Sequence, residues 1–184
     1  SESENELWLL GYQYDETTRQ GVELELSGEL CQNCLFVTAN YTYMNARYED
    51  DDLIDGAFLG GFDLDDEEMW GVPTHSASLA VTYLPTADLT LDVRAKMVRD
   101  NKSVLEHVPG VTSGEEDENY MVVDASVSYD WKDFTIFAGV NNIFNQEYSE
   151  IGIGGLPLFG GIPSLAWPAP ERNFFAGIRY VKEF

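Results

Sequence analysis

Residues 21–30 read GVELELSGEL, and this stretch decides the fold class. Its apolar and polar residues alternate strictly up to Ser27: Val22, Leu24, Leu26 and Leu30 against Glu23, Glu25, Ser27 and Glu29. A period of two residues places every apolar side chain of an extended chain on the same face. The stretch therefore predicts a β-strand that lies between an apolar and a polar environment.

The same alternation returns along the rest of the chain. It occupies residues 35–43, 77–83, 89–97, 121–131, 134–140 and 174–180, and residues 7–14 are expected to form an eighth strand. Tight turns at 32–33, 85–88 and 131–133 alternate with long connections at about 49–74, 100–119 and 149–172. Short turns at one end, long loops at the other and strands of about ten residues are typical of transmembrane β-barrels. The sequence therefore predicts an all-β, antiparallel membrane barrel.

A soluble β-sandwich is the alternative, because its strands show the same alternation. Two features favour the membrane barrel. The polar face carries charges, as a polar lumen would: Asp92, Arg94, Lys96, Asp124 and Arg179. The aromatic residues, 13% of the chain, gather near the strand ends, where interfacial girdles lie.

The charge balance excludes one class of partner. The chain contains 10 Lys and Arg residues and 33 Asp and Glu residues, which give a net charge of −23. No basic surface for DNA or RNA can therefore be assembled. The acid is concentrated in the long connections, at 49–52, 63–68 and 115–118. The uncharged run 151–170 has the length of a membrane helix, but its four prolines predict a loop.

Five segments resemble those of TonB-dependent outer-membrane receptors, and they occur in the order found in that family. They are GVELELS at 21–27, NYTY followed by Ala46 at 40–46, GVPTHSA at 71–77, VNNIFNQEY at 140–148 and PERNF at 170–174. The resemblance implies that residues 1–184 are the last seven or eight strands of a 22-stranded barrel, without its plug domain. The final Phe184 is similar to the aromatic end that the barrel-assembly machinery reads in this family, although Lys182 departs from the pattern.

The same resemblance implies a function. We expect a receptor in the outer membrane of a Gram-negative bacterium, surrounded by lipid and lipopolysaccharide. It would take up a ferric siderophore, less readily cobalamin or haem, and contact TonB through the missing plug. An enzyme is not expected, because no Ser/His/Asp set converges at the strand ends. A small self-contained barrel with a structural or adhesive role stays open, and residues 7–14 would then close the ring.

Several residues are candidates for ligand binding. Arg94, Lys96 and Arg179 face the predicted lumen, where they could contact an anionic ligand or pair with Asp92, Asp124 or the plug. His107 lies in a predicted outer loop, where this family of receptors can carry haem ligands, and an ordinary loop histidine is the alternative. Phe159 and Trp167 lie in the loop 151–167 and could contact an apolar ligand group or neighbouring loops.

Two further sites are suggested by residue type. Asp63, Asp65, Asp66 and Glu67 offer the oxygen ligands that Ca²⁺ takes, although a solvated or lipopolysaccharide-bridged acidic loop gives the same composition. Cys31 and Cys34 flank a two-residue turn, and in the periplasm we expect them to form a disulfide rather than a zinc or redox site. No catalytic residue and no cofactor other than Ca²⁺ is expected.

Overall fold

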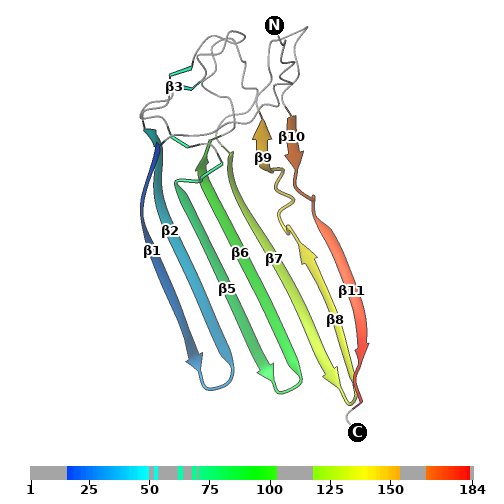
Figure 1. Cartoon of the computed structure of the whole chain (residues 1–184). Coiled ribbons are helices and arrows are strands. Elements are labelled where there is room, and N and C mark those ends of the chain that lie inside the picture. The colour runs from blue at the N-terminus through cyan, green and yellow to red at the C-terminus, as the bar shows by residue number, and fades with distance from the viewer. Residues whose placement is uncertain are drawn as a thin grey trace, which may run out of the picture.

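The computed structural model describes residues 16–49, 52–53, 62–63, 68–69, 71–102, 118–153 and 165–182. Seven of its strands form one antiparallel sheet in the order β1-β2-β5-β6-β7-β8-β11 (Figure 1). These strands are β1 (Glu16–Cys31), β2 (Leu35–Glu49), β5 (His75–Thr86), β6 (Leu89–Asn101), β7 (Glu118–Trp131), β8 (Phe134–Asn141) and β11 (Asn173–Tyr180). The seven predicted strands and the all-β, antiparallel fold class are therefore confirmed. The eighth strand expected at 7–14 lies outside the described residues.

Two short hairpins lie in the long connections. They pair β3 (Asp52–Leu53) with β4 (Phe62–Asp63) and β9 (Ser149–Ile153) with β10 (Leu165–Pro168). The second hairpin occupies part of the run that the sequence predicts as a loop, and Pro168 stands at its end, where a missing N–H is tolerated. No helix in the described ranges is long and apolar enough to cross a membrane.

Strand register keeps one face of the sheet apolar from edge to edge. A single row crosses all seven strands through Gly28, Val37, Val81, Val93, Ala125, Val140 and Phe174. The adjacent row on the opposite face holds Ser27, Thr38, Ala80, Arg94 and Asp124. The apolar side chains are open to the surroundings, as 69% exposure of both Leu26 and Ile178 shows. An apolar face of this extent needs a nonpolar environment or a partner.

The two ends of the sheet differ in their connections. Three tight turns join β1 to β2, β5 to β6 and β7 to β8 at the end of the sheet where β11 finishes (Figure 1). The opposite end carries the three long connections. Among the described residues β1 and β11 are the edges of the sheet, since each pairs with one neighbour. The sheet is therefore open, as a part of a larger barrel would be.

Packing is concentrated at the loop end. Tyr48 is 2% exposed and forms a small core with Ala46 and Met69, against which Met44 and Val72 pack. The main chain supports this contact, because the Met69 N–H donates to the Ala46 carbonyl over 2.9 Å. Met69 and Val72 thus pack on the end of β2, on the side of the sheet next to the long connections.

Candidate functional site

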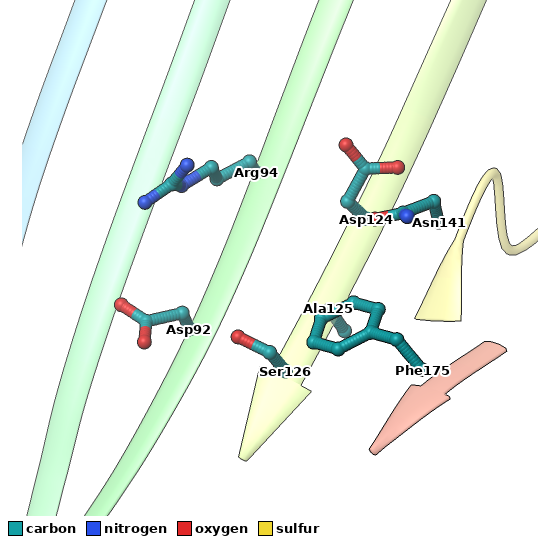
Figure 2. Close-up of a pocket in the computed structure, with 7 residues that line it drawn as sticks. All are labelled: Asp92, Arg94, Asp124, Ala125, Ser126, Asn141 and Phe175. Carbon is teal, nitrogen blue, oxygen red and sulfur yellow. The ribbon is translucent and has the colours of Figure 1, made fainter. Parts of the chain in front are cut away.

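The polar face is hollowed where β5, β6 and β7 lie side by side. One hollow, drawn in Figure 2, is lined by Asp92, Arg94, Asp124, Ala125, Ser126, Asn141 and Phe175. An adjoining groove of about 380 Å³ extends toward β2 and the loop end. Its polar lining comprises Thr38, Asn40, Ser78, Arg94, Lys96, Asp124 and Tyr148. The two hollows share Arg94 and Asp124, so these residues stand at the centre of the candidate site.

Arg94 has no acidic partner within the described part of the chain, although Asp124 is its register neighbour on β7. Asp124 instead accepts a hydrogen bond from the Asn142 N–H over 2.8 Å. Asp92 accepts one from the Thr82 hydroxyl over 2.6 Å. Figure 2 shows the Arg94 guanidinium directed away from the Asp124 carboxylate. Other donors therefore use the two carboxylates, and the guanidinium extends over β5, on the side of the adjoining groove (Figure 2).

Lys96 is the next polar-face residue on β6 and has a different environment. Its Nζ lies 3.4 Å from Glu150 Oε1 and 5.6 Å from the centroid of the Tyr120 ring. Tyr120 in turn stacks on Tyr148, with ring centroids 4.3 Å apart. Lys96 thus pairs with Glu150, which sequence reasoning did not single out, rather than with Asp92 or Asp124.

Tyr148 lies between β8 and β9 and lines the groove. Burial raises the pKa of its phenol, and the nearby Glu150 carboxylate raises it further. Because an ordinary tyrosine already titrates near pH 10, this hydroxyl stays protonated at neutral pH. It therefore offers the groove a neutral donor rather than a negative charge.

The chain after β8 makes a tightly bonded turn around Asn142, which we call the Asn142 turn (residues 142–148). The Asn142 side chain is buried, with 2% exposure, and its Oδ1 accepts the Gln146 N–H over 2.8 Å. Its Nδ2 donates to the carbonyls of Gln146, over 2.8 Å, and Pro170, over 3.4 Å. Asn142 itself has a φ of 53°, a conformation that asparagine tolerates better than most residues.

The return segment before β11 is bonded to the Asn142 turn. The Arg172 N–H donates to Asn145 Oδ1 over 2.9 Å, and the Ala169 N–H donates to the Tyr148 carbonyl over 2.9 Å. The segments VNNIFNQEY and PERNF, which carry part of the family resemblance in the sequence, are therefore in direct contact. This contact fixes Tyr148 and Glu150 beside Lys96. Sequence reasoning missed this role, although the paired asparagines were a signal for tight turns.

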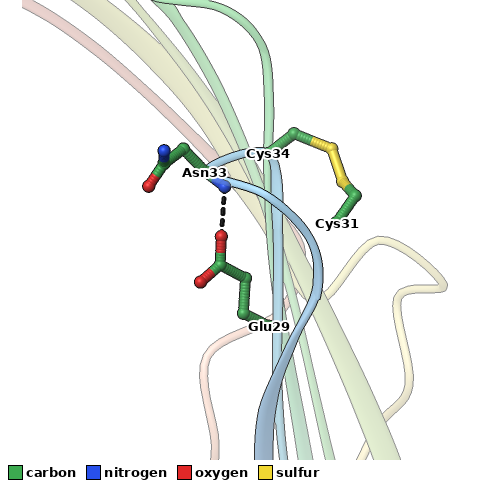
Figure 3. The surroundings of a disulfide bond; sticks show 4 residues. All are labelled: Glu29, Cys31, Asn33 and Cys34. Carbon is green, nitrogen blue, oxygen red and sulfur yellow. Dashed lines mark hydrogen bonds between the residues drawn. A yellow bond between two sulfur atoms is a disulfide. The ribbon is translucent and has the colours of Figure 1, made fainter.

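The tight turn between β1 and β2 contains a disulfide between Cys31 and Cys34, with Cα atoms 5.4 Å apart (Figure 3). Inside the turn the Asn33 N–H donates to the Glu29 carboxylate. The Leu84 N–H donates to the Cys34 carbonyl over 2.7 Å and connects the turn to β5. The disulfide therefore closes a turn at the end of the sheet opposite the long connections.

Of the remaining candidates, Arg179 is the one whose side chain the structure describes, and it does not line the groove. Arg179 lies on the polar face of β11. Asn173 on the same strand is the register partner of Asn141, which lines the hollow. Arg179 is six residues further along β11, or about 20 Å away. His107, Phe159, Asp65, Asp66 and Glu67 lie outside the described residues, as do the side chains of Asp63 and Trp167. Within the described ranges, no three His, Cys, Asp or Glu side chains are grouped to hold a metal ion.

Solved structures of transport proteins share this fold. The siderophore receptor PiuA from Acinetobacter baumannii aligns with a TM-score of 0.70 and 19% identity over 89% of this chain and 22% of its own. The ferric yersiniabactin uptake receptor FyuA from Yersinia pestis aligns with a TM-score of 0.63 and 16% identity, over 88% of this chain and 23% of the receptor. The copper transporter OprC aligns with a TM-score of 0.61 and 19% identity, over 89% of this chain and 24% of the transporter. The chain thus spans less than a quarter of the length of these proteins.

Sequence comparison identifies the family. No curated protein sequence matches the chain. The family model described as TonB dependent receptor-like, beta-barrel matches residues 5–143. This is a family of transport receptors rather than enzymes, and its match covers most of the chain. The chain therefore belongs to the TonB-dependent receptor β-barrel family.

Proposed function

We propose that this chain is the C-terminal barrel segment of an outer-membrane TonB-dependent transporter that takes up a ferric siderophore or a similar scarce nutrient. The observation that carries the proposal is the two-faced sheet. Its apolar row is continuous across seven strands, while charged residues such as Arg94 and Lys96 lie on the opposite face. A sheet of this kind suits a wall between lipid and a polar lumen.

The rest of the transporter follows from this assignment. The open edges β1 and β11 would pair with further strands of the same barrel, because exposed edges invite aggregation. The polar face would surround a plug domain, through which TonB acts. The end of the chain would be read by the barrel-assembly machinery, and lipid and lipopolysaccharide would cover the apolar face.

An anionic cargo is favoured over a bare metal cation. The groove carries Arg94 and Lys96, and the single carboxylate in its lining, Asp124, is occupied by the Asn142 N–H. Cations at a binding surface attract anions and repel metal ions. Ferric siderophores are commonly anionic, whereas a copper ion would need soft or imidazole ligands.

Uptake by the native bacterium tests the proposal. We expect deletion of the gene to abolish energy-dependent uptake of radioactive iron from at least one ferric siderophore, and a plasmid copy to restore it. Copper and cobalamin uptake, measured in the same cells, should be unchanged. Unaltered uptake of every siderophore, together with absence of the protein from the outer-membrane fraction, would contradict it.

A small self-contained barrel is the alternative, and refolding the chain alone into detergent micelles separates the two. A compact band that unfolds on boiling would indicate a closed barrel and overturn the proposal. Aggregation without such a band is expected for a sheet with two unpaired edges.

A further inference from the structure

The turn that contains the disulfide is held mainly by contacts between near neighbours in the sequence. Cys31 and Cys34 are three positions apart, and the Cys34 N–H donates to the Cys31 carbonyl over 3.1 Å. Asn33 has a φ of 53° and donates its N–H to the Glu29 carboxylate (Figure 3). One further bond, from the Leu84 N–H to the Cys34 carbonyl, comes from β5. Residues 29–34 can therefore adopt this turn, and bring the two sulfur atoms together, before the other strands are in place.

The hairpin that this turn closes has a weak first strand. β1 contains two glycines and four glutamates among its 16 residues, and both residue types are depleted in β-strands. Glu23, Glu25 and Glu29 lie on one face of β1, and their register partners on β2 are uncharged: Thr42, Asn40 and Phe36. No cation across the strand pair therefore offsets the repulsion among these glutamates. The pairing of β1 with β2 benefits from a covalent link that keeps the two strands together.

The position of the disulfide points to a role during assembly. Once the sheet is complete, the hydrogen-bonded ladder between β1 and β2 extends over the whole hairpin, and a link across so few residues adds little to it. Before the ladder exists, loop closure opposes hairpin formation, because its entropy is lost before cross-strand contacts are made. A turn that is already closed removes part of this barrier.

We propose that Cys31 and Cys34 are a substrate site for a periplasmic thiol oxidase, an oxidoreductase with a reactive disulfide, which closes the turn on the unassembled chain and speeds the pairing of β1 with β2. This inference rests on the proposed function, which places the tight turns in the periplasm. The thiolate of one cysteine attacks the oxidase disulfide and forms a mixed disulfide, and the thiolate of the other displaces the oxidase. Two electrons and two protons pass from the cysteines to the oxidase, which leaves as a dithiol.

Pulse labelling of the complete receptor in the native bacterium tests the order of events. Free thiols are counted from the gel shift with a polyethylene glycol maleimide, and the receptor with Cys31→Ser and Cys34→Ser gives the background. The intact receptor is compared with a variant that lacks residues 173–180 and so cannot complete the sheet. Both should be oxidised at the same rate. In cells without the periplasmic thiol oxidase, both thiols should still be free at the end of the chase.

Two outcomes of this experiment would overturn the proposal. Free thiols in the truncated variant alone would show that the disulfide closes only in the assembled sheet. Unchanged oxidation in the cells without the oxidase would show that the turn is not its substrate.

The rate of folding tests the role in assembly. The complete receptor is unfolded in urea, with the disulfide intact or reduced by dithiothreitol, and diluted into phospholipid vesicles. The compact band on an unboiled gel should appear about threefold faster with the disulfide intact, since a closed turn removes part of the loop-closure entropy. The variant with both cysteines replaced by serine should fold at the slower rate with or without dithiothreitol. Equal rates for the intact and reduced parent would overturn the assembly role, even in a receptor that reaches the outer membrane and takes up siderophore, so the two proposals can fail separately.

Discussion

The half of the sheet near the tight turns and the half near the long connections are stabilised differently. All the described residues that are buried lie toward the loop end: Ala46, Tyr48, Met69, Val98, Asn101, Tyr120, Asn142 and Ser149. The turn half is a single layer of hydrogen-bonded strands, with exposed apolar side chains such as Leu26 and Leu30 on one face. The loop half is therefore stabilised partly by side-chain packing within the chain. The stability of the turn half depends on the nonpolar environment that covers its apolar face.

The largest loss of stability is expected from a charge on the apolar face of the sheet. Val81→Lys places a charge in the middle of the apolar row and should destabilise the complete receptor in phospholipid vesicles by about 2–4 kcal/mol. Thr90→Lys is the matched control, because threonine has the shape of valine and Thr90 lies on the polar face, opposite Ser128. Urea-induced unfolding measures both.

Equal destabilisation by the two substitutions would mean that the faces do not meet different environments. The distinction between an apolar, lipid-facing and a polar, lumen-facing surface would then be lost. A large effect of Val81→Lys alone would instead sharpen it.

The loop half is tested by removing the Asn142 side chain, which makes three hydrogen bonds. Asn142→Ala loses the three side-chain hydrogen bonds to Gln146 and Pro170 and places alanine at a φ of 53°. At about 1 kcal/mol for each of these contributions, allowing for the long bond to Pro170, the total loss is about 3 kcal/mol. Amide hydrogen exchange should rise at Gln146 and Ala169, while the tight turns keep their protection.

Asn142→Gly separates the two causes. Glycine accepts the positive φ but restores none of the hydrogen bonds, so it should recover only about 1 kcal/mol. Full recovery by glycine would show that backbone conformation, and not the bonds to Gln146 and Pro170, accounts for the loss.

The contrast between the halves also explains what could be predicted from the sequence. In the turn half each strand has one polar and one apolar face, so a period of two residues located all seven strands. Toward the loop end the pattern changes phase: Tyr41 and Tyr43 share the apolar face, whereas Ala46 and Tyr48 are buried on the opposite one. Met69 and Val72 cover that face, and their contact with β2 joins residues far apart in the sequence, which no local pattern reveals.

The candidate site was predicted only in part for the same reason. The alternation placed Arg94 and Lys96 on the polar face, because position on a strand determines the face. It could not find Glu150, whose position beside Lys96 depends on the Asn142 turn and the return segment near Arg172. Side-chain hydrogen bonds between distant loops leave no periodic signal, although the two asparagines at positive φ mark the turn itself.

A smaller effect is expected at Gly139, which lies on the polar face of β8. A Cβ at Gly139 would collide with the Phe175 ring and lie 2.8 Å from the Ala125 carbonyl oxygen, which the sheet holds in place. Gly139→Ala should therefore cost about 2 kcal/mol through overpacking. Gly28→Ala is the control, because a Cβ there meets nothing within 4 Å, and it should change stability little. If Gly139→Ala behaved like Gly28→Ala, the packing of Phe175 over β8 would be wrong.

The smallest effect is expected at the tight turn closed by Cys31 and Cys34. A disulfide across so few residues removes little entropy from the unfolded chain, so replacing both cysteines with serine should cost at most about 2 kcal/mol. The hairpin should keep its register, because the Asn33 N–H still bonds to Glu29 and the Leu84 N–H to the Cys34 carbonyl. Treating the parent with dithiothreitol should reproduce the loss, and treating the double variant should add nothing. A collapse of the whole turn half on reduction would show that this covalent link, rather than the strand ladder and its surroundings, holds that half together.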